Sequence, residues 1–242
     1  MKIGFCGCSH STSSYGKSWA QFMKEKLDAV TFDLSASGVG NEMNIERLKY
    51  LAEKRDIDFY IYQITDPSRL VLGLYGNDVK EEYEKFYDLE YSSENVNCTR
   101  NFNGIDYYTF KINENDEFLN KLLKSNYSVQ NFLENHVLIS DFNMKIKIFH
   151  TLMSIQYIFD FYDKKILFFS WGVDILKLAK EVGYSKIMNK LDIVEGCVED
   201  FAQLKNLKKV DVSHYETESH EIIYNEYLEP KLNEFMKKYN IV

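Results

Sequence analysis

Short apolar runs alternate with amphipathic stretches over the first third of the chain. The apolar runs have strand length, and they are Lys2–Gly7, Ala29–Leu34 and Asp58–Thr65. Between them, Trp19–Leu27 and Glu42–Lys54 carry apolar residues three or four positions apart, which is the spacing of one helix face. The order strand–helix–strand–helix–strand predicts a central parallel sheet with helices on its faces.

The pattern weakens in the middle of the chain and then returns. Residues from about 74 to 116 are rich in Asn, Tyr, Glu and Ser and show weak periodicity. We interpret residues from about 74 to 135 as an insertion or cover and not as a second core. Residues 117–160 are mostly helical in pattern, Lys164–Trp171 reads as a further strand, a short segment surrounds Ile193, and a final helix runs from about His220 to Tyr239. We therefore expect one α/β domain over residues 1–242.

Composition and charge indicate which kind of partner the protein binds: nucleic acid, a membrane or a small molecule. The chain has 242 residues, 45% of them apolar and 27% charged, with a formal net charge of −8. That acidic balance argues against a protein that coats nucleic acid, which usually carries a basic face. No run approaches the roughly 18 apolar residues of a membrane span, and Met1–Ser9 does not resemble a secretory signal. We expect a cytoplasmic protein, or one packaged in a virion, that acts on a small molecule.

The four cysteines are Cys6, Cys8, Cys98 and Cys197. Without a secretory signal we expect free thiols in a reducing compartment. Cys6-x-Cys8-x-His10 has alternate residues on one strand face, which is compatible with a metal site. Small buried residues in a tight strand explain the pair more simply, so we expect neither a metal nor a cofactor.

Small and polar residues follow each predicted strand. In open α/β sheets, ligands bind at the carboxyl ends of the strands. The segments that follow the first three strands are Gly7-Cys8-Ser9-His10-Ser11, Ser37-Gly38-Val39-Gly40-Asn41 and Thr65-Asp66-Pro67-Ser68-Arg69. A fourth polar segment, Asp211-Val212-Ser213-His214, comes before the last helix.

These residue types match nucleophilic catalysis. A serine hydroxyl needs a base to take its proton, and a carboxylate to orient that base. Asp211 and His214, three positions apart, can supply both from one turn, with Ser9 as the nucleophile. Backbone N–H groups of Ser9 and Gly38 can stabilise an oxyanion. The simpler interpretations are a turn or capping role for Ser9 and a loop histidine bonded to a carbonyl for His214.

The order of these segments resembles the SGNH (GDSL-type) hydrolase family. Its first block is Gly-Asp-Ser-x-Ser/Thr, matched by Gly7-Cys8-Ser9-His10-Ser11, and its last is Asp-x-x-His before a C-terminal helix, matched by Asp211 to His214. The resemblance implies a flavodoxin-like three-layer α/β/α sandwich. It also implies Ser9 as nucleophile, His214 as base, Asp211 as its orienter and Gly38 in the oxyanion hole.

The sequence departs from the family pattern at two blocks. The third block is Gly-x-Asn-Asp, whose Asn donates to the oxyanion hole, and here Thr65 occupies the Asn position. Asn41 and Thr65 are the candidate replacements for that donor. Cys8 replaces the acidic residue of the first block. His10, Asp66 and Arg69 are candidate substrate-binding residues, because they follow the same strands.

The leading hypothesis is an esterase-type serine hydrolase of small acyl esters, with O-acetyl groups on carbohydrate as the class that the family suggests. The second is a non-catalytic binding or structural protein that keeps the fold within a larger assembly, such as a viral particle. The third is a nucleotide-binding protein, because Tyr15-Gly16-Lys17-Ser18 ends like a P-loop. That match lacks the first glycine, since Ser11 holds its position.

Overall fold

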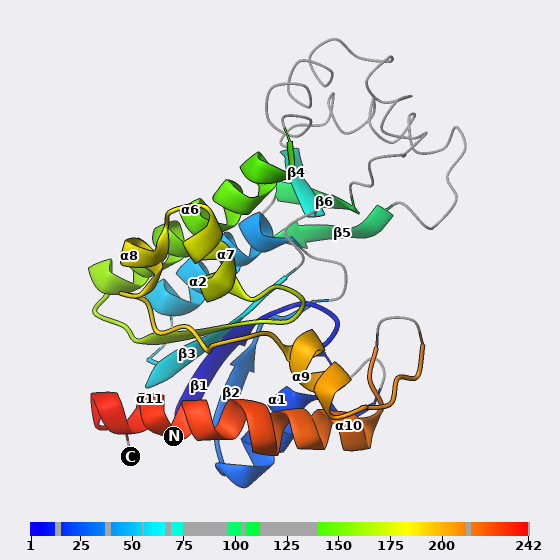
Figure 1. Cartoon of the computed structure of the whole chain (residues 1–242). Helices are drawn as coiled ribbons and strands as arrows, with labels where there is room; N and C mark the ends of the chain where they lie inside the picture. The colour runs from blue at the N-terminus through cyan, green and yellow to red at the C-terminus, as the bar shows by residue number, and fades with distance from the viewer. Residues whose placement is uncertain are drawn as a thin grey trace.

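The computed structural model describes residues 1–12, 16–36, 40–54, 56–65, 69–74, 96–102, 105–111, 140–211 and 214–241. For residues 54, 69–74, 96–102, 105–111 and 140–144 it describes the backbone alone. Within these ranges, helices cover both faces of a central sheet (Figure 1).

The central sheet is parallel and four-stranded, in the order β2-β1-β3-β7. Its strands are β1 (Lys2–Cys6), β2 (Val30–Asp33), β3 (Phe59–Ile64) and β7 (Ile166–Ser170). A single parallel bridge between Phe168 and Ile193 continues the pairing beyond β7. The four predicted strands and their parallel arrangement are confirmed, with ends that differ by one or two residues.

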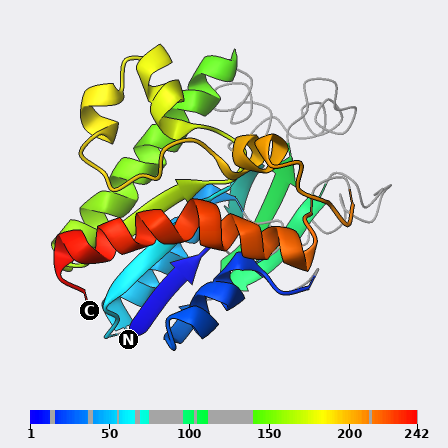
Figure 2. The same cartoon turned by 60° about the horizontal axis from the view of Figure 1, so that its bottom comes forward.

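Helices form the two outer layers. One layer contains α2 (Asn41–Lys54), α6 (Ser140–Phe161), α7 (Ile175–Glu181) and α8 (Ser185–Met188). The other contains α1 (Trp19–Lys26), α9 (Val198–Leu204), α10 (Thr217–Ile222), the π-helical turn η1 (Ile223–Leu228) and α11 (Glu229–Tyr239). Figure 2 shows α11, in red, running across one face of the sheet.

Successive side chains of a strand point to opposite faces of the sheet, so they pack into two separate apolar cores. Phe59 and Ile61 of β3 face the layer of α1 and α11, where they meet Trp19. Tyr60 and Tyr62 of the same strand face the opposite core, formed with α2 and α6. All six residues of β3 are buried, as expected for a central parallel strand covered on both sides. The predicted three-layer α/β/α sandwich is confirmed.

The C-terminal helix differs from the single helix predicted from His220 to Tyr239. The chain is helical from Thr217 to Tyr239, but a π-helical turn separates α10 from α11. Pro230 lies in the first turn of α11. Because proline has no N–H to donate to the carbonyl four residues earlier, the regular ladder is interrupted there, and a wider turn precedes it.

A second sheet combines a strand just before the region interpreted as an insertion or cover with two strands inside that region. Its strands are antiparallel in the order β4-β6-β5, with β4 (Arg69–Leu74), β5 (Val96–Phe102) and β6 (Ile105–Lys111). β4 contacts α2, and Figure 1 shows the small sheet beside that helix. Residues 75–95 and 112–139 lie outside the described residues, so the insertion stays a prediction.

None of the helices in the described ranges combines the length and the apolar composition needed to cross a bilayer.

Replacing Phe169 with alanine should lower the free energy of unfolding by about 3–5 kcal/mol, because the ring is fully buried and a cavity would remain. The Phe169 and Trp19 rings form a T-shaped pair, with 5.0 Å between ring centroids and 85° between ring planes. Urea unfolding followed by circular dichroism measures the change. The matched control is Phe161→Ala on α6, where the ring is 73% exposed and a change within about 0.5 kcal/mol is expected. Equal effects of the two substitutions would contradict the assignment of the core.

Candidate active site

Ser9 lies in a tight turn directly after β1. The Ser11 N–H donates to the Cys8 carbonyl at 3.0 Å, so Ser9 and His10 are the two central residues of a β-turn. The Thr12 N–H and hydroxyl both donate to the Ser9 carbonyl, at 3.2 and 2.9 Å. These bonds fix the backbone on both sides of the Ser9 hydroxyl.

Asp211 and His214 lie on a loop that returns on itself between α9 and α10. The Val210 N–H donates to the His214 carbonyl at 2.8 Å, and the Glu216 N–H donates to the Lys208 carbonyl at 3.1 Å. The Ser219 hydroxyl, at the start of α10, also donates to the Lys208 carbonyl at 3.0 Å. The loop is therefore tied at its base to the helix that follows it.

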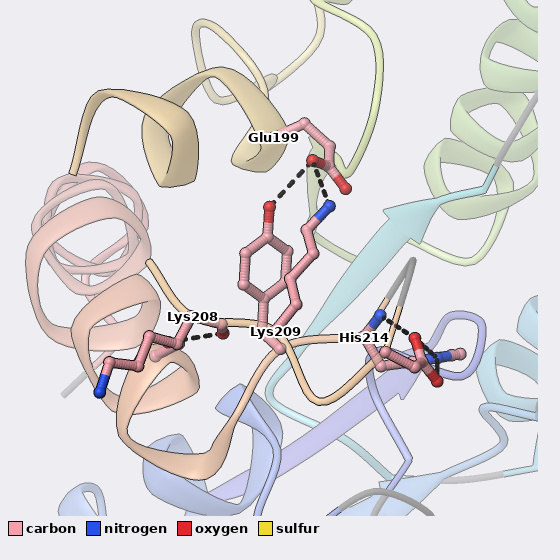
Figure 3. Close-up of polar contacts among 7 residues, drawn as sticks. Glu199, Lys208, Lys209 and His214 are labelled. Atoms are coloured by element: carbon pink, nitrogen blue, oxygen red, sulfur yellow. Dashed lines mark hydrogen bonds and ion pairs between the residues drawn. The ribbon is translucent and has the colours of Figure 1, made fainter. Parts of the chain in front are cut away.

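Glu199 in the first turn of α9 is the second anchor of this loop. Its carboxylate accepts from the Tyr215 hydroxyl at 2.9 Å and from Lys209 Nζ at 3.3 Å. The contact between Glu199 and Lys209 can be followed in Figure 3. Burial raises the pKa of Tyr215, so the hydroxyl keeps its proton and donates. The Glu199 N–H in turn donates to the Trp171 carbonyl at 2.9 Å, which connects the loop to the end of β7.

The structure brings Ser9, His214 and Asp211 together in hydrogen-bonding order. His214 Nδ1 lies 2.8 Å from Asp211 Oδ2 and 3.0 Å from Oδ1. Because an ionised carboxylate only accepts, Nδ1 carries the proton, and Nε2 presents its lone pair. Ser9 Oγ lies 3.0 Å from that Nε2, although the two residues are 205 positions apart. The His214 N–H also donates to Asp211 Oδ1 at 2.7 Å.

Aromatic rings surround this arrangement on one side. His10 stacks on Trp171 with 4.0 Å between ring centroids and 8° between planes, and it lies 5.1 Å from the ring of His214. His220 belongs to the same cluster, with 5.8 Å between its ring centroid and that of Trp171. Burial, with a smaller contribution from nearby His214, lowers the pKa of His220 to about 4, so this ring is neutral at physiological pH.

Asn41 and Thr65 form one buried network at the ends of α2 and β3. Asn41 Oδ1 accepts from the Thr65 N–H at 2.9 Å, the Thr65 hydroxyl at 3.1 Å and the Tyr62 hydroxyl at 2.6 Å. Asn41 Nδ2 donates to the Thr65 carbonyl at 3.2 Å. The backbone partners fix which amide atom is oxygen and which is nitrogen. One of the two Nδ2 protons serves Thr65, and the amide carries a second.

Three predicted site residues cannot be placed by their side chains. Gly38 and Asp66 lie outside the described residues, and Arg69 is described by its backbone alone, as the first residue of β4. The contributions predicted for all three stay predictions.

The cysteine and P-loop segments are used in internal contacts. Cys6 and Cys8 are buried free thiols, and burial raises the pKa of Cys6, which opposes the thiolate that a metal needs. No cluster of metal-ligating side chains occurs within the described residues. Lys17 pairs with Glu25, and the Ser18 hydroxyl donates to the Ser11 carbonyl at 3.0 Å. The cationic and hydroxyl groups of a P-loop are thus engaged within the protein.

Sequence patterns missed two buried residues beside the turn and the rings. The pattern predicts Trp171 only as the end of a strand, and Gln63 only as one residue of an apolar strand. For Gln63 a signal existed, because it is the lone amide in the strand Phe59–Ile64, and a buried amide needs partners.

Comparisons with known proteins bear on the fold. No family model matches the sequence, and no curated protein matches it. Among solved structures, that of TesA aligns over 97% of this chain and 99% of its own, with a TM-score of 0.54 and 11% identity. This chain therefore shares the overall fold of TesA.

Two further solved structures align with lower scores. The esterase EstA from Pseudoalteromonas sp. aligns over 99% of this chain and 98% of its own, with a TM-score of 0.48 and 12% identity. Axe2, an acetylxylan esterase from Geobacillus stearothermophilus, aligns over 95% of this chain and 93% of its own, with a TM-score of 0.45 and 12% identity. Only the alignment with TesA is used to assign the fold.

Stability should fall as the pH drops from 7 to 4, and His220 should carry part of that loss. In the unfolded chain the ring takes up a proton near its ordinary pKa of 6.5, whereas in the folded protein it does so only near 4. The unfolded state therefore binds more protons across this window, which favours unfolding by up to about 3 kcal/mol at the acidic end. In His220→Gln that part of the pH dependence should vanish.

Urea unfolding at several pH values between 4 and 7 measures the difference in slope. His150→Gln is the matched control, since His150 is exposed on α6, and this variant should keep the slope of the unmodified protein. An unchanged slope in His220→Gln would contradict the buried, neutral state of His220.

Proposed function

We propose that the protein is an esterase-type serine hydrolase in which Ser9 is the nucleophile, His214 the general base and Asp211 the residue that orients the base. The observation that supports this most strongly is the continuous chain from Ser9 Oγ to His214 Nε2 and from His214 Nδ1 to Asp211, at 3.0 and 2.8 Å. A serine that only capped a helix would not need a histidine lone pair from 205 positions away.

In the acylation half, Ser9 Oγ attacks the carbonyl carbon of the ester while its proton moves to His214 Nε2. The carbonyl oxygen becomes an oxyanion, and the Asp211 carboxylate stabilises the imidazolium across its two short contacts. The tetrahedral intermediate then collapses: the bond to the alcohol oxygen breaks, His214 returns the proton to that oxygen, and the acyl group stays on Ser9.

In the deacylation half, water replaces the alcohol. His214 Nε2 takes a proton from the water as its oxygen attacks the acyl carbon. When this second intermediate collapses, the bond to Ser9 Oγ breaks, the proton returns to Ser9, and the carboxylic acid leaves. No oxidant, reductant or further reactant is required, so the described side chains supply the proton transfers.

We propose that the oxyanion is stabilised by the Ser9 N–H, by the Gly38 N–H and by the second Nδ2 proton of Asn41. The Thr65 hydroxyl suits this role less well, because it already donates to Asn41 Oδ1. Three donors on Oδ1 and one acceptor at Nδ2 hold the Asn41 amide rigidly. Such preorganisation gives oxyanion donors their effect. Asn41 would thereby take over from the family's third-block asparagine.

We propose small acyl esters as the substrate class. Ser9 is only 6% exposed, and the neighbouring His10 and Trp171 rings are also buried, which limits the room for an acyl chain. Acetyl esters fit this restriction best. Carbohydrate as the alcohol portion is the expectation from the family resemblance.

A fluorophosphonate probe and p-nitrophenyl acetate test this function directly. The unmodified protein should be labelled and should hydrolyse the ester. Ser9→Ala and His214→Ala should abolish labelling and lower kcat by about 10⁴- to 10⁶-fold, because the two residues act as a unit. Asp211→Asn should also lower kcat, by about 10⁴-fold, since the imidazole then adopts the wrong tautomer.

Ser154→Ala and His150→Ala are the matched controls, because both residues are exposed on α6. Both variants should keep the labelling rate and kcat of the unmodified protein. A well-folded protein that is neither labelled nor active on short esters would overturn the hydrolase proposal and favour the non-catalytic alternative.

Asn41→Asp tests the oxyanion role separately. The substitution keeps an oxygen for the three donors and removes the amide protons, so kcat for p-nitrophenyl acetate should fall about 10²- to 10³-fold. Tyr62→Phe removes one donor to the same oxygen but leaves the amide protons in place, and should lower kcat less than about threefold. Equal losses in the two variants would mean that only the integrity of the network matters.

A further inference from the structure

Gln63 is a polar residue in a strand that is otherwise apolar. Its side chain is 0% exposed, and it lies on β3 between Tyr62 and Ile64. Burying an amide costs free energy unless its donor and acceptor both find partners. An apolar residue would satisfy the core at no such cost, so the partners of the amide are the key to its role.

Both polar atoms of the Gln63 amide contact the turn that carries Ser9. The Ser11 hydroxyl donates to Gln63 Oε1, and Gln63 Nε2 donates to Cys8 Sγ at 3.1 Å. Cys8 and Ser11 are the first and fourth residues of the β-turn, closed by the Ser11 N–H on the Cys8 carbonyl at 3.0 Å. One side chain therefore holds both ends of the turn, with Ser9 between them.

The same contact explains why residue 7 is a glycine. A Cβ atom at residue 7 would lie 2.7 Å from Gln63 Oε1 and 2.9 Å from Gln63 Cβ, and closer still to Ser11 Oγ. These separations are shorter than real carbon contacts allow. The absence of a side chain at residue 7 lets the strand amide and the turn hydroxyl meet.

We infer that Gln63 is a positioning residue for the nucleophile, which rests on the proposed function of Ser9. Among the described residues, its side-chain hydrogen bonds go to Ser11 and Cys8 and not to Ser9 or His214. Its effect passes through Cys8 and Ser11, which set where the Ser9 hydroxyl stands relative to His214 Nε2. Because β3 is a buried central strand, the two hydrogen bonds of the Gln63 amide attach the turn to the interior of the sheet.

A positioning role has a kinetic signature. Gln63→Met keeps the length of the side chain and removes both hydrogen bonds. The turn then loses its link to β3, and kcat for p-nitrophenyl acetate should fall about 10- to 100-fold, as expected when a nucleophile moves by a fraction of an ångström to an ångström. KM should change less than about twofold, because the variant leaves the residues around the ester in place.

Gln63→Glu adds a readout that a merely structural role would not move. A protonated carboxyl group can accept from Ser11 and donate to Cys8 Sγ, as the amide does, whereas a carboxylate cannot donate. Burial raises the pKa of a carboxyl group above its ordinary value of about 4.3. In this variant kcat should fall as the pH rises through that new pKa, and the unmodified protein should lack this limb of the profile.

Tyr60→Phe is the matched control, because it removes a buried hydrogen bond from the same strand without touching the turn. The Tyr60 hydroxyl donates to the Leu51 carbonyl of α2 at 3.3 Å. Its kcat and pH profile should equal those of the unmodified protein, even if its unfolding midpoint falls.

The outcomes separate the two proposals. In the first outcome, the unmodified protein reacts with the fluorophosphonate, both Gln63 variants react at the rate of the unmodified protein, and the pH profile of Gln63→Glu has no additional limb. The positioning role is then wrong, and the hydrolase proposal stands. If the unmodified protein does not react at all, the hydrolase proposal fails and the positioning role fails with it. If Gln63→Met does not fold, Gln63→Glu decides the question from its pH profile at constant circular dichroism.

Discussion

The parallel alignment of β1 with β3 is the constraint on which the candidate site depends. With Gly4 beside Tyr60 and Cys6 beside Tyr62, the turn after β1 lies against the last residues of β3. The same pairing continues from β3 to β7, whose end leads to Trp171. Because carboxyl ends of parallel strands meet at one edge, segments that are distant in sequence converge there. A shift by one residue would turn the Gln63 side chain into the opposite core.

Local patterns in the sequence were sufficient for much of this architecture. The strands and helices around the central sheet follow from residue spacing, because each buries one side or both sides of a regular element. Ser9 after the first strand and Asp211 with His214 three positions on were also visible, since their chemistry needs only short-range spacing. The structure places these three side chains in contact, which a linear pattern can suggest but cannot establish.

Other features depend on neighbours far along the chain and leave little local trace. The stack of His10 on Trp171 joins residues from two strand ends. The hydrogen bond from Tyr215 to Glu199 joins the loop that carries His214 to the helix α9. The antiparallel strands β5 and β6 fall in a stretch of weak periodicity that predicts no regular element, and β4 begins in the polar segment that follows the third strand. Gln63 looked like an exception in an apolar strand until its partners were known.

The position of the His214 loop late in the chain determines when the candidate site can be assembled during synthesis. The strands β1, β2 and β3 and the Ser9 turn precede β7 in the chain, so they emerge earlier during synthesis. The residues that anchor the loop carrying His214, namely Trp171, Glu199 and Ser219, emerge later. Because long-range contacts form only once both partners are present, a chain that ends before this loop holds Ser9 without His214. Under the proposed function, hydrolytic activity would arise only after the loop that carries His214 has packed beside the Ser9 turn.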